Sequence, residues 1–187
     1  MALQQTDSLA TARLRLDSLS HIALPVRDLD RSEFFYTRVL GATFIRRVEI
    51  PASIPPQRYD SRLEVRWGPI DLQLFRQPFG ERSIQADHPH HAFTTRGSQI
   101  DRWQDLFTSW GIPSDIVCRQ HGQKGMGDVC SVELYFMDPD GNSLELDADD
   151  YVFSERVVWA PFDQWDLVYN PSQWWESHKH TFTARKS

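Results

Sequence analysis

The sequence predicts an α+β fold built from two β-α-β-β-β modules. Two segments, one beginning "HIALPV" at His21 and the other "HHAF" at His90, resemble each other when offset by 69 residues. Each is followed by an amphipathic helix pattern that ends at a glycine, and each half closes with two strands joined by a tight turn. An offset of this length is typical of a duplicated unit rather than of a solenoid repeat.

The first strand of each module has two different faces. In "HIALPV", Ile22, Leu24 and Val26 point to one side, and His21 and Ala23 point to the other. In "HHAF", His90 and Ala92 likewise share a face. Each module therefore begins with a histidine on the face that its core residues avoid.

The helices follow these strands and have recognisable ends. Asp30 with Glu33, and Ser98 with Asp101, resemble N-terminal capping boxes. A glycine suits the left-handed position after the last turn, and one closes each pattern: Gly41 and Gly111.

The last two strands of each module read "LEVRWGPIDLQLF" and "VELYFMDPDGNSLEL". Gly68-Pro69 and Pro139-Asp140-Gly141 supply the turns. The final strand then carries one polar residue between two leucines, Gln73 in the first module and Glu145 in the second. We place the domain at residues 18–150, with modules at about 18–80 and 87–150, an N-terminal extension at 1–17 and an aromatic-rich C-terminal extension at 151–187.

Composition excludes several classes of protein. A chain of 187 residues, 40% hydrophobic, can bury a core without disulfides. The formal net charge of -6 and the absence of a basic run argue against nucleic-acid binding. No stretch has the length of a membrane span, and residues 1–17 lack the apolar run of a signal peptide. With two cysteines we expect a reduced, cytoplasmic protein.

Strand alternation places His21, His90 and Glu145 on equivalent faces of the two modules. Two imidazoles and one carboxylate form the facial triad typical of mononuclear Fe(II) or Mn(II) sites with open coordination positions. Taken singly, a strand histidine is more often structural and a strand glutamate more often solvated. Their recurrence at equivalent positions of a duplicated unit favours the metal site.

These motifs resemble the vicinal oxygen chelate superfamily, which includes glyoxalase I, fosfomycin and bleomycin resistance proteins and extradiol dioxygenases. The resemblance covers about residues 18–150 and rests on "SHIALPVRDLDRSEFFYTRVLG", "HPHHAF" and "YFMDPDGNSLEL". It implies a half-open barrel around a metal, with His21, His90 and Glu145 as the ligands. Glyoxalase-type members use a fourth ligand, generally Glu, where this chain has Gln73, so we expect three.

Among these enzymes, the first expectation is an extradiol dioxygenase that cleaves a catechol-like substrate with Fe(II), or alternatively Mn(II). Tyr135 and His121 are then the candidate catalytic residues. "VCRQHG" resembles the "Cys-x-x-His-Gly" stretch of small extradiol dioxygenases, but twelve residues separate His121 from Leu134, too many for that family's motif. His121 is equally well explained as an exposed loop residue, and fosfomycin-type members also carry a tyrosine at the position of Tyr135.

Two other functions remain open. One is a redox-neutral lyase, isomerase, epimerase or thiol transferase that uses the metal as a Lewis acid. The other is a binding protein that sequesters an aromatic toxin, although an intact triad counts against it.

Two structural questions also remain open. The tail with Trp159, Trp165, Trp174 and Trp175 either covers the barrel mouth, which would favour an aromatic small-molecule substrate, or packs on the core or at a subunit interface. We expect His178 and His180 to be solvated. We also expect a homo-oligomer, most simply a homodimer, in which His21 completes the metal site of its own chain or of its partner.

Overall fold

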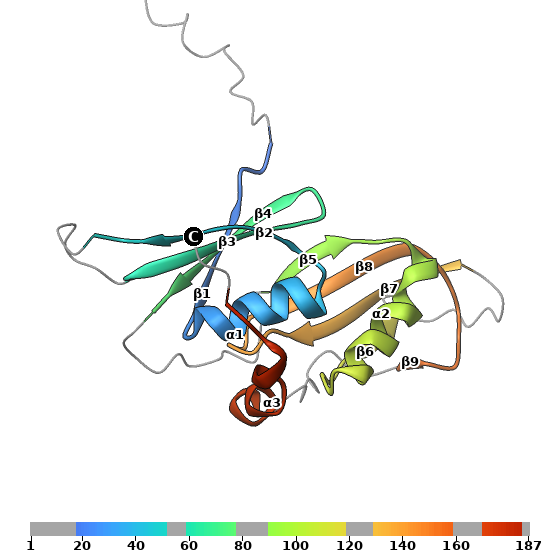
Figure 1. Cartoon of the computed structure of the whole chain (residues 1–187). Helices are drawn as coiled ribbons and strands as arrows, with labels where there is room; N and C mark the ends of the chain where they lie inside the picture. The colour runs from blue at the N-terminus through green and yellow to red at the C-terminus, as the bar shows by residue number, and fades with distance from the viewer. Residues whose placement is uncertain (1–17, 52–58, 78–89, 119–128, 159–169, 185–187) are drawn as a thin grey trace, which may run out of the picture.

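Two mixed β-sheets, each accompanied by a helix, form the body of the protein (Figure 1). The structure is a computed structural model that describes residues 18–51, 59–77, 90–118, 129–158 and 170–184. The first sheet has the strand order β1-β4-β3-β2 and the second β5-β8-β7-β6-β9. Each module runs β-α-β-β-β, which confirms the predicted fold class.

The first module comprises β1 (Ile22–Val26), α1 (Leu29–Phe34), the π-helical turn η1 (Phe35–Val39), β2 (Thr43–Glu49), β3 (Ser61–Trp67) and β4 (Ile70–Arg76). The second comprises β5 (His90–Thr94), α2 (Gly97–Ser109), β6 (Asp115–Cys118), β7 (Val129–Met137) and β8 (Ser143–Val152). The C-terminal extension contributes β9 (Val157–Val158), α3 (Pro171–His178) and the short 3-10 helix η2 (Lys179–Thr181). No helix within the described ranges is long and apolar enough to cross a membrane.

Strand register confirms the internal repeat. β1 pairs in parallel with β4, and Ala23 lies opposite Gln73. β5 pairs in parallel with β8, and Ala92 lies opposite Glu145. Gln73 and Glu145 therefore occupy equivalent positions in the two sheets.

The predicted helix ends are confirmed, whereas the predicted caps are wrong. Gly41 and Gly111 adopt positive φ angles of 71° and 67°, in the left-handed region that favours glycine. Asp28, rather than Asp30, caps α1 by accepting hydrogen bonds from two backbone N–H groups. The helix α2 starts at Gly97, whose N–H donates to the Asp150 carboxylate on β8 at 2.5 Å. A tertiary contact thus replaces the local cap that the sequence suggested.

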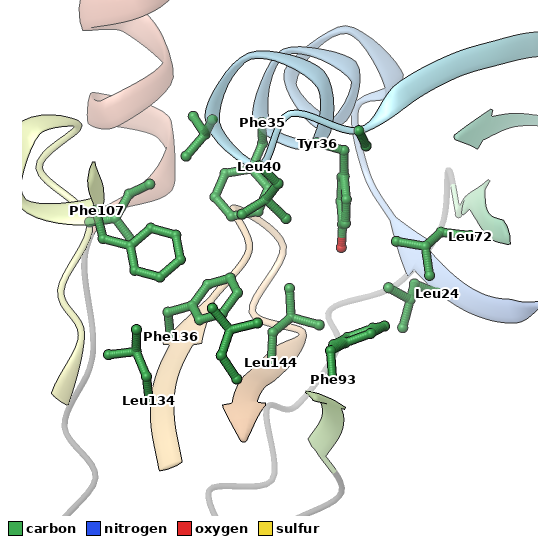
Figure 2. Packing of buried hydrophobic residues seen from close by; sticks show 14 of the residues in the cluster. Leu24, Phe35, Tyr36, Leu40, Leu72, Phe93, Phe107, Leu134, Phe136 and Leu144 are labelled. Carbon is green, nitrogen blue, oxygen red and sulfur yellow. The ribbon is translucent and has the colours of Figure 1, made fainter. Parts of the chain in front are cut away.

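A single apolar cluster joins the two modules beneath the helices (Figure 2). The rings of Phe107 on α2 and Phe136 on β7 lie 4.3 Å apart between centroids. Trp67 at the end of β3 meets Phe93 on β5 at 4.6 Å, which links the first sheet to the second. These contacts fix which face of each sheet is left for polar residues.

A buried polar network also ties β1, α1 and η1 to the turn between β7 and β8. The Tyr36 hydroxyl donates to Asp138 at 2.9 Å, and Arg31 pairs with Asp140 at 2.7 Å. Asn142 donates from its side chain to the Pro25 carbonyl at 3.1 Å. Burial and the nearby charge of Asp140 raise the pKa of Asp138 to about 6, against the hydrogen bonds that favour its ionised form.

The described part of the C-terminal extension packs on the core. Trp174 is 6% exposed, and its indole N–H donates to the Trp110 carbonyl at 2.7 Å. Phe34 lies at the centre of a cluster of aromatic rings formed by Trp110, Trp174, Trp175 and Phe182. Trp159 and Trp165 lie outside the described residues. We expected the tail either to cover the barrel mouth or to pack on the core or at an interface, and residues 170–184 pack on the core.

The two histidines near the C-terminus differ from each other. The ring of His178 lies 4.9 Å from that of Trp174 and is half-buried, so our expectation of a solvated side chain was wrong. His180 is exposed, as expected.

Candidate metal site

Two of the three predicted metal ligands meet on the polar face of the second sheet. Glu145 lies on β8, where Leu144 and Leu146 turn to the opposite face and into the core. The Glu145 residue is 2% exposed, and its Oε2 lies 2.8 Å from His90 Nε2 on β5. The strand therefore carries a buried carboxylate that an imidazole meets on the face away from the core.

This donor pair fits a divalent metal. A carboxylate oxygen and an imidazole nitrogen suit ions such as Mn(II) and Fe(II). Both atoms lie on rigid, paired strands, which hold ligands in position better than loops do. The His90 side chain is 28% exposed and that of Glu145 is 3% exposed, so the imidazole is the member of the pair that is open to the outside of the sheet.

Tyr135 stands beside the pair on β7. It lies directly opposite Glu145 in the β7–β8 register, and its ring meets that of His90 edge-on at 5.8 Å. Its hydroxyl donates to Glu133 Oε2 at 2.6 Å. Burial, this hydrogen bond and the charge of Glu145 raise the pKa of Tyr135 well above its usual range, so the phenol keeps its proton at neutral pH.

Carboxylates dominate this face of the second sheet. Tyr135 is flanked by Glu145 on one neighbouring strand and Asp115 on the other. Glu133 is opposite Asp147. The strands β5, β6, β7 and β8 contain no Lys or Arg. The face therefore carries negative charge that a bound divalent cation would neutralise in part.

His21 lies elsewhere in the chain. It precedes β1 in the first sheet, is exposed, and has Ser20 Oγ at 3.1 Å from its Nδ1. Its charge contributes to lowering the pKa of Asp71, behind the larger effect of Arg66. Among the described residues, which include His21, His90 and Glu145, no three His, Cys, Asp or Glu side chains are grouped as a metal site. One chain thus brings together two of the three predicted ligands.

The equivalent face of the first sheet has a different chemistry. Gln73 stands at the position of Glu145 and is flanked by Glu64 on β3. Glu64 is held by Arg46 at 2.6 Å and by Arg62 at 2.7 Å. Two guanidinium groups thus already engage the carboxylate opposite Gln73, so the described part of this face offers His21 as the donor that suits a metal.

Of the two predicted catalytic residues, Tyr135 lies at the site and His121 falls outside the described residues. Glu133 is a site residue that the sequence analysis missed. The available signal was the pattern "ELY", in which Glu133 and Tyr135 share a face of one strand.

Comparison with known proteins identifies relatives of this chain. The model of the Glyoxalase/Bleomycin resistance protein/Dioxygenase superfamily matches residues 18–146. The chain is 27% identical over 131 residues to "Glutathione transferase FosA" of Serratia marcescens, covering 70% of this chain and 80% of that protein. It is 26% identical over 160 residues to "Metallothiol transferase FosB" of Staphylococcus saprophyticus, covering 82% and 94%.

Solved structures show the same fold. The fosfomycin resistance protein FosX of Listeria monocytogenes, complexed with Mn(II) and sulfate, superimposes with a TM-score of 0.51 at 19% identity, over 72% of this chain and 91% of that one. A glyoxalase/bleomycin resistance protein/dioxygenase from Alicyclobacillus acidocaldarius superimposes with a TM-score of 0.53 at 24% identity, over 75% and 95%.

Proposed function

Because the chain belongs to the Glyoxalase/Bleomycin resistance protein/Dioxygenase superfamily, we propose that it is a divalent-metal-dependent enzyme that adds a thiol to a small electrophile. The pair of His90 and Glu145 carries this proposal, since a buried carboxylate beside an imidazole suits a metal. The names of the relatives, a glutathione transferase and a metallothiol transferase, describe thiol transfer. They support our redox-neutral alternative more than the ring-cleaving dioxygenase.

In this proposal the metal site spans two copies of the chain. His90 and Glu145 hold the ion from one copy, and His21 of a second copy completes the three-ligand set. His21 precedes β1 of the first sheet, whereas His90 and Glu145 lie on the second sheet, which supports this arrangement. Mn(II), the ion in the FosX structure, is the first to test, ahead of the Fe(II) that a dioxygenase would use.

The bound ion would act as a Lewis acid that polarises an oxygen atom of the substrate. The chain's own groups then orient the reactants. Tyr135 keeps its proton and shares it with Glu133, so the phenol positions the substrate rather than attacking it. The reaction is redox-neutral, because a carbon–sulfur bond forms, a carbon–oxygen bond breaks, and the thiol proton ends on the released oxygen.

No support remains for an aromatic substrate among the described residues. Trp174 and Trp175 of the tail pack against Phe34 on α1 rather than over the polar face of the second sheet. A small epoxide is therefore the first electrophile to test, and fosfomycin, the compound in the names of the FosX structures, is an epoxide.

The test is thiol consumption by the Mn(II)-loaded protein with a panel of epoxides and either glutathione or cysteine, with products identified by mass. We expect epoxide-dependent addition that is lost in Glu145→Gln. Asp149→Asn is the matched control, because Asp149 lies on the same strand, is exposed, and accepts a hydrogen bond from the Ser131 hydroxyl at 2.7 Å. Dioxygen uptake with a catechol, giving a ring-cleaved product, would instead establish the dioxygenase.

A further inference from the structure

The contact between Tyr135 and Glu133 bears on which substrate the proposed site accepts. Both residues are buried, at 3% and 7% exposed, and both face the side of β7 that carries the candidate metal pair. Their oxygen atoms are 2.6 Å apart, a short distance for a hydrogen bond and typical of one to a carboxylate. Val117 on β6 packs with Tyr135, which fixes the ring.

A phenol has one proton to donate. Glu133 is a carboxylate acceptor, and it engages that proton at close range. Tyr135 therefore has no proton to offer to an anionic group of a substrate. A substrate that carries its own donor, such as an alcohol or an amine, meets oxygen acceptors here.

The charges around Tyr135 also disfavour an anionic substrate. Asp115 and Glu145 flank it on the neighbouring strands, and Asp147 lies across from Glu133. The described strands of this sheet supply no Lys or Arg. Four carboxylates outnumber the two positive charges of one divalent ion, so a phosphonate or carboxylate at this face would still meet like charge, which costs free energy.

The first sheet, which supplies His21 to the proposed two-copy site, carries arginines near Gln73, and carboxylates engage them. Arg66 pairs with Asp71 at 2.7 Å. Arg46 and Arg62 share Glu64. Three arginines thus stand against two carboxylates, which leaves one net positive charge on this described part of the first sheet, compared with the four carboxylates around Tyr135.

We infer that Glu133 determines specificity, and that it restricts the site to neutral or cationic substrates that present a hydrogen-bond donor to it, in preference to phosphonates. This inference rests on the proposed function and narrows its substrate class. Glu133 also fixes the Tyr135 hydroxyl, and it acts on substrate binding rather than on the bonds that form and break.

The experiment compares three small epoxides: glycidol, which is neutral with a hydroxyl donor; glycidyl methyl ether, which is neutral without one; and fosfomycin, which carries a phosphonate. Binding is measured without thiol, from the broadening of ligand proton resonances by Mn(II) in the loaded protein, with Mg(II) as the diamagnetic reference. The variants are Glu133→Gln, which removes the charge but keeps an acceptor for the Tyr135 proton, and the matched control Asp149→Asn. Thermal unfolding establishes that each variant is folded.

We expect the wild-type protein to bind glycidol at least about tenfold more tightly than fosfomycin, and more tightly than the methyl ether. Glu133→Gln should reduce the preference for glycidol over fosfomycin by about tenfold, whereas Asp149→Asn should leave this preference unchanged. Fosfomycin binding as tightly as glycidol in the wild type, an unchanged preference in Glu133→Gln, or no binding of any of the three would overturn the inference.

Thiol addition, measured separately, distinguishes this inference from the proposed function. Thiol transfer that favours fosfomycin would keep the function and refute the role of Glu133. The expected binding order without any thiol transfer would keep the role of Glu133 and refute the function.

Discussion

Replacing Trp174 with alanine tests whether the C-terminal extension stabilises the fold or lines the active site. Trp174 is 6% exposed on α3 and belongs to the core cluster beneath the helices. Glu145 lies on the opposite, polar face of the second sheet. We therefore expect a large loss of stability with no change in metal affinity.

The size of the loss follows from the burial of this residue. A tryptophan this deeply buried removes roughly 200 Å² from water, worth about 5 kcal/mol at about 25 cal/mol per Å². A compact unfolded state reduces that figure by roughly 10–40%, and the lost hydrogen bond to the Trp110 carbonyl adds about 1 kcal/mol. We expect Trp174→Ala to lower the free energy of unfolding by about 4–5.5 kcal/mol.

The assay is urea unfolding followed by far-UV circular dichroism, with Mn(II) affinity measured on the folded variant. Trp175→Ala is the comparison, because Trp175 is less deeply buried than Trp174 and should cost about 2–3 kcal/mol. A loss below about 1 kcal/mol for Trp174→Ala, or a loss of metal affinity in a stable protein, would refute the reasoning.

Three further predictions concern the fold and the site. A side chain on Gly97 would collide with the backbone of β8, so Gly97→Ala should lower the free energy of unfolding by about 2–3 kcal/mol in the same urea assay. Gly68 has open space around it, and Gly68→Ala should cost about 1 kcal/mol. The pKa of Asp138 lies near 6, above its value of 3.8 in an unfolded chain, so the native state binds the proton more tightly. The free energy of unfolding of the wild type, measured relative to that of Asp138→Asn, should therefore rise by up to about 3 kcal/mol as the pH falls from about 7 to about 4. A difference between the two proteins that stays flat or falls over this pH range would contradict this pKa. At Mn(II) concentrations about 1,000 times the wild-type Kd, the metal should add about 4 kcal/mol to the free energy of unfolding of the wild type and of Asp149→Asn. The gain in Glu145→Gln should be no more than about 1.4 kcal/mol. A gain of about 4 kcal/mol in Glu145→Gln would show that Glu145 is not a ligand.

The sequence was sufficient to predict the two modules and the faces of their strands. Side chains alternate along every strand, so a leucine on each side of Glu145 predicted which way the carboxylate points, and the structure confirms its burial on the polar face. The glycines that end the helices are equally local signals, because a positive φ depends on the residue itself.

Features that depend on distant contacts escaped prediction. Asp150 reaches the start of α2 from β8, and no local pattern announces a cap of that kind. The packing of Trp174 against Phe34 depends on where the chain returns after β9, which residue spacing does not encode. Glu133 was missed for another reason, since its role arises from the hydroxyl of Tyr135 rather than from a motif of its own.

The most direct test of the account is the metal content of mixed dimers. His21→Ala and Glu145→Gln chains, each unable to bind Mn(II) alone, are unfolded together, refolded, and the mixed species isolated by two different affinity tags. If His21 of one copy completes the site of the other, a mixed dimer has one intact site and binds one Mn(II) ion for every two chains. If all three ligands come from one chain, the mixed dimer binds no metal, and the shared site is refuted.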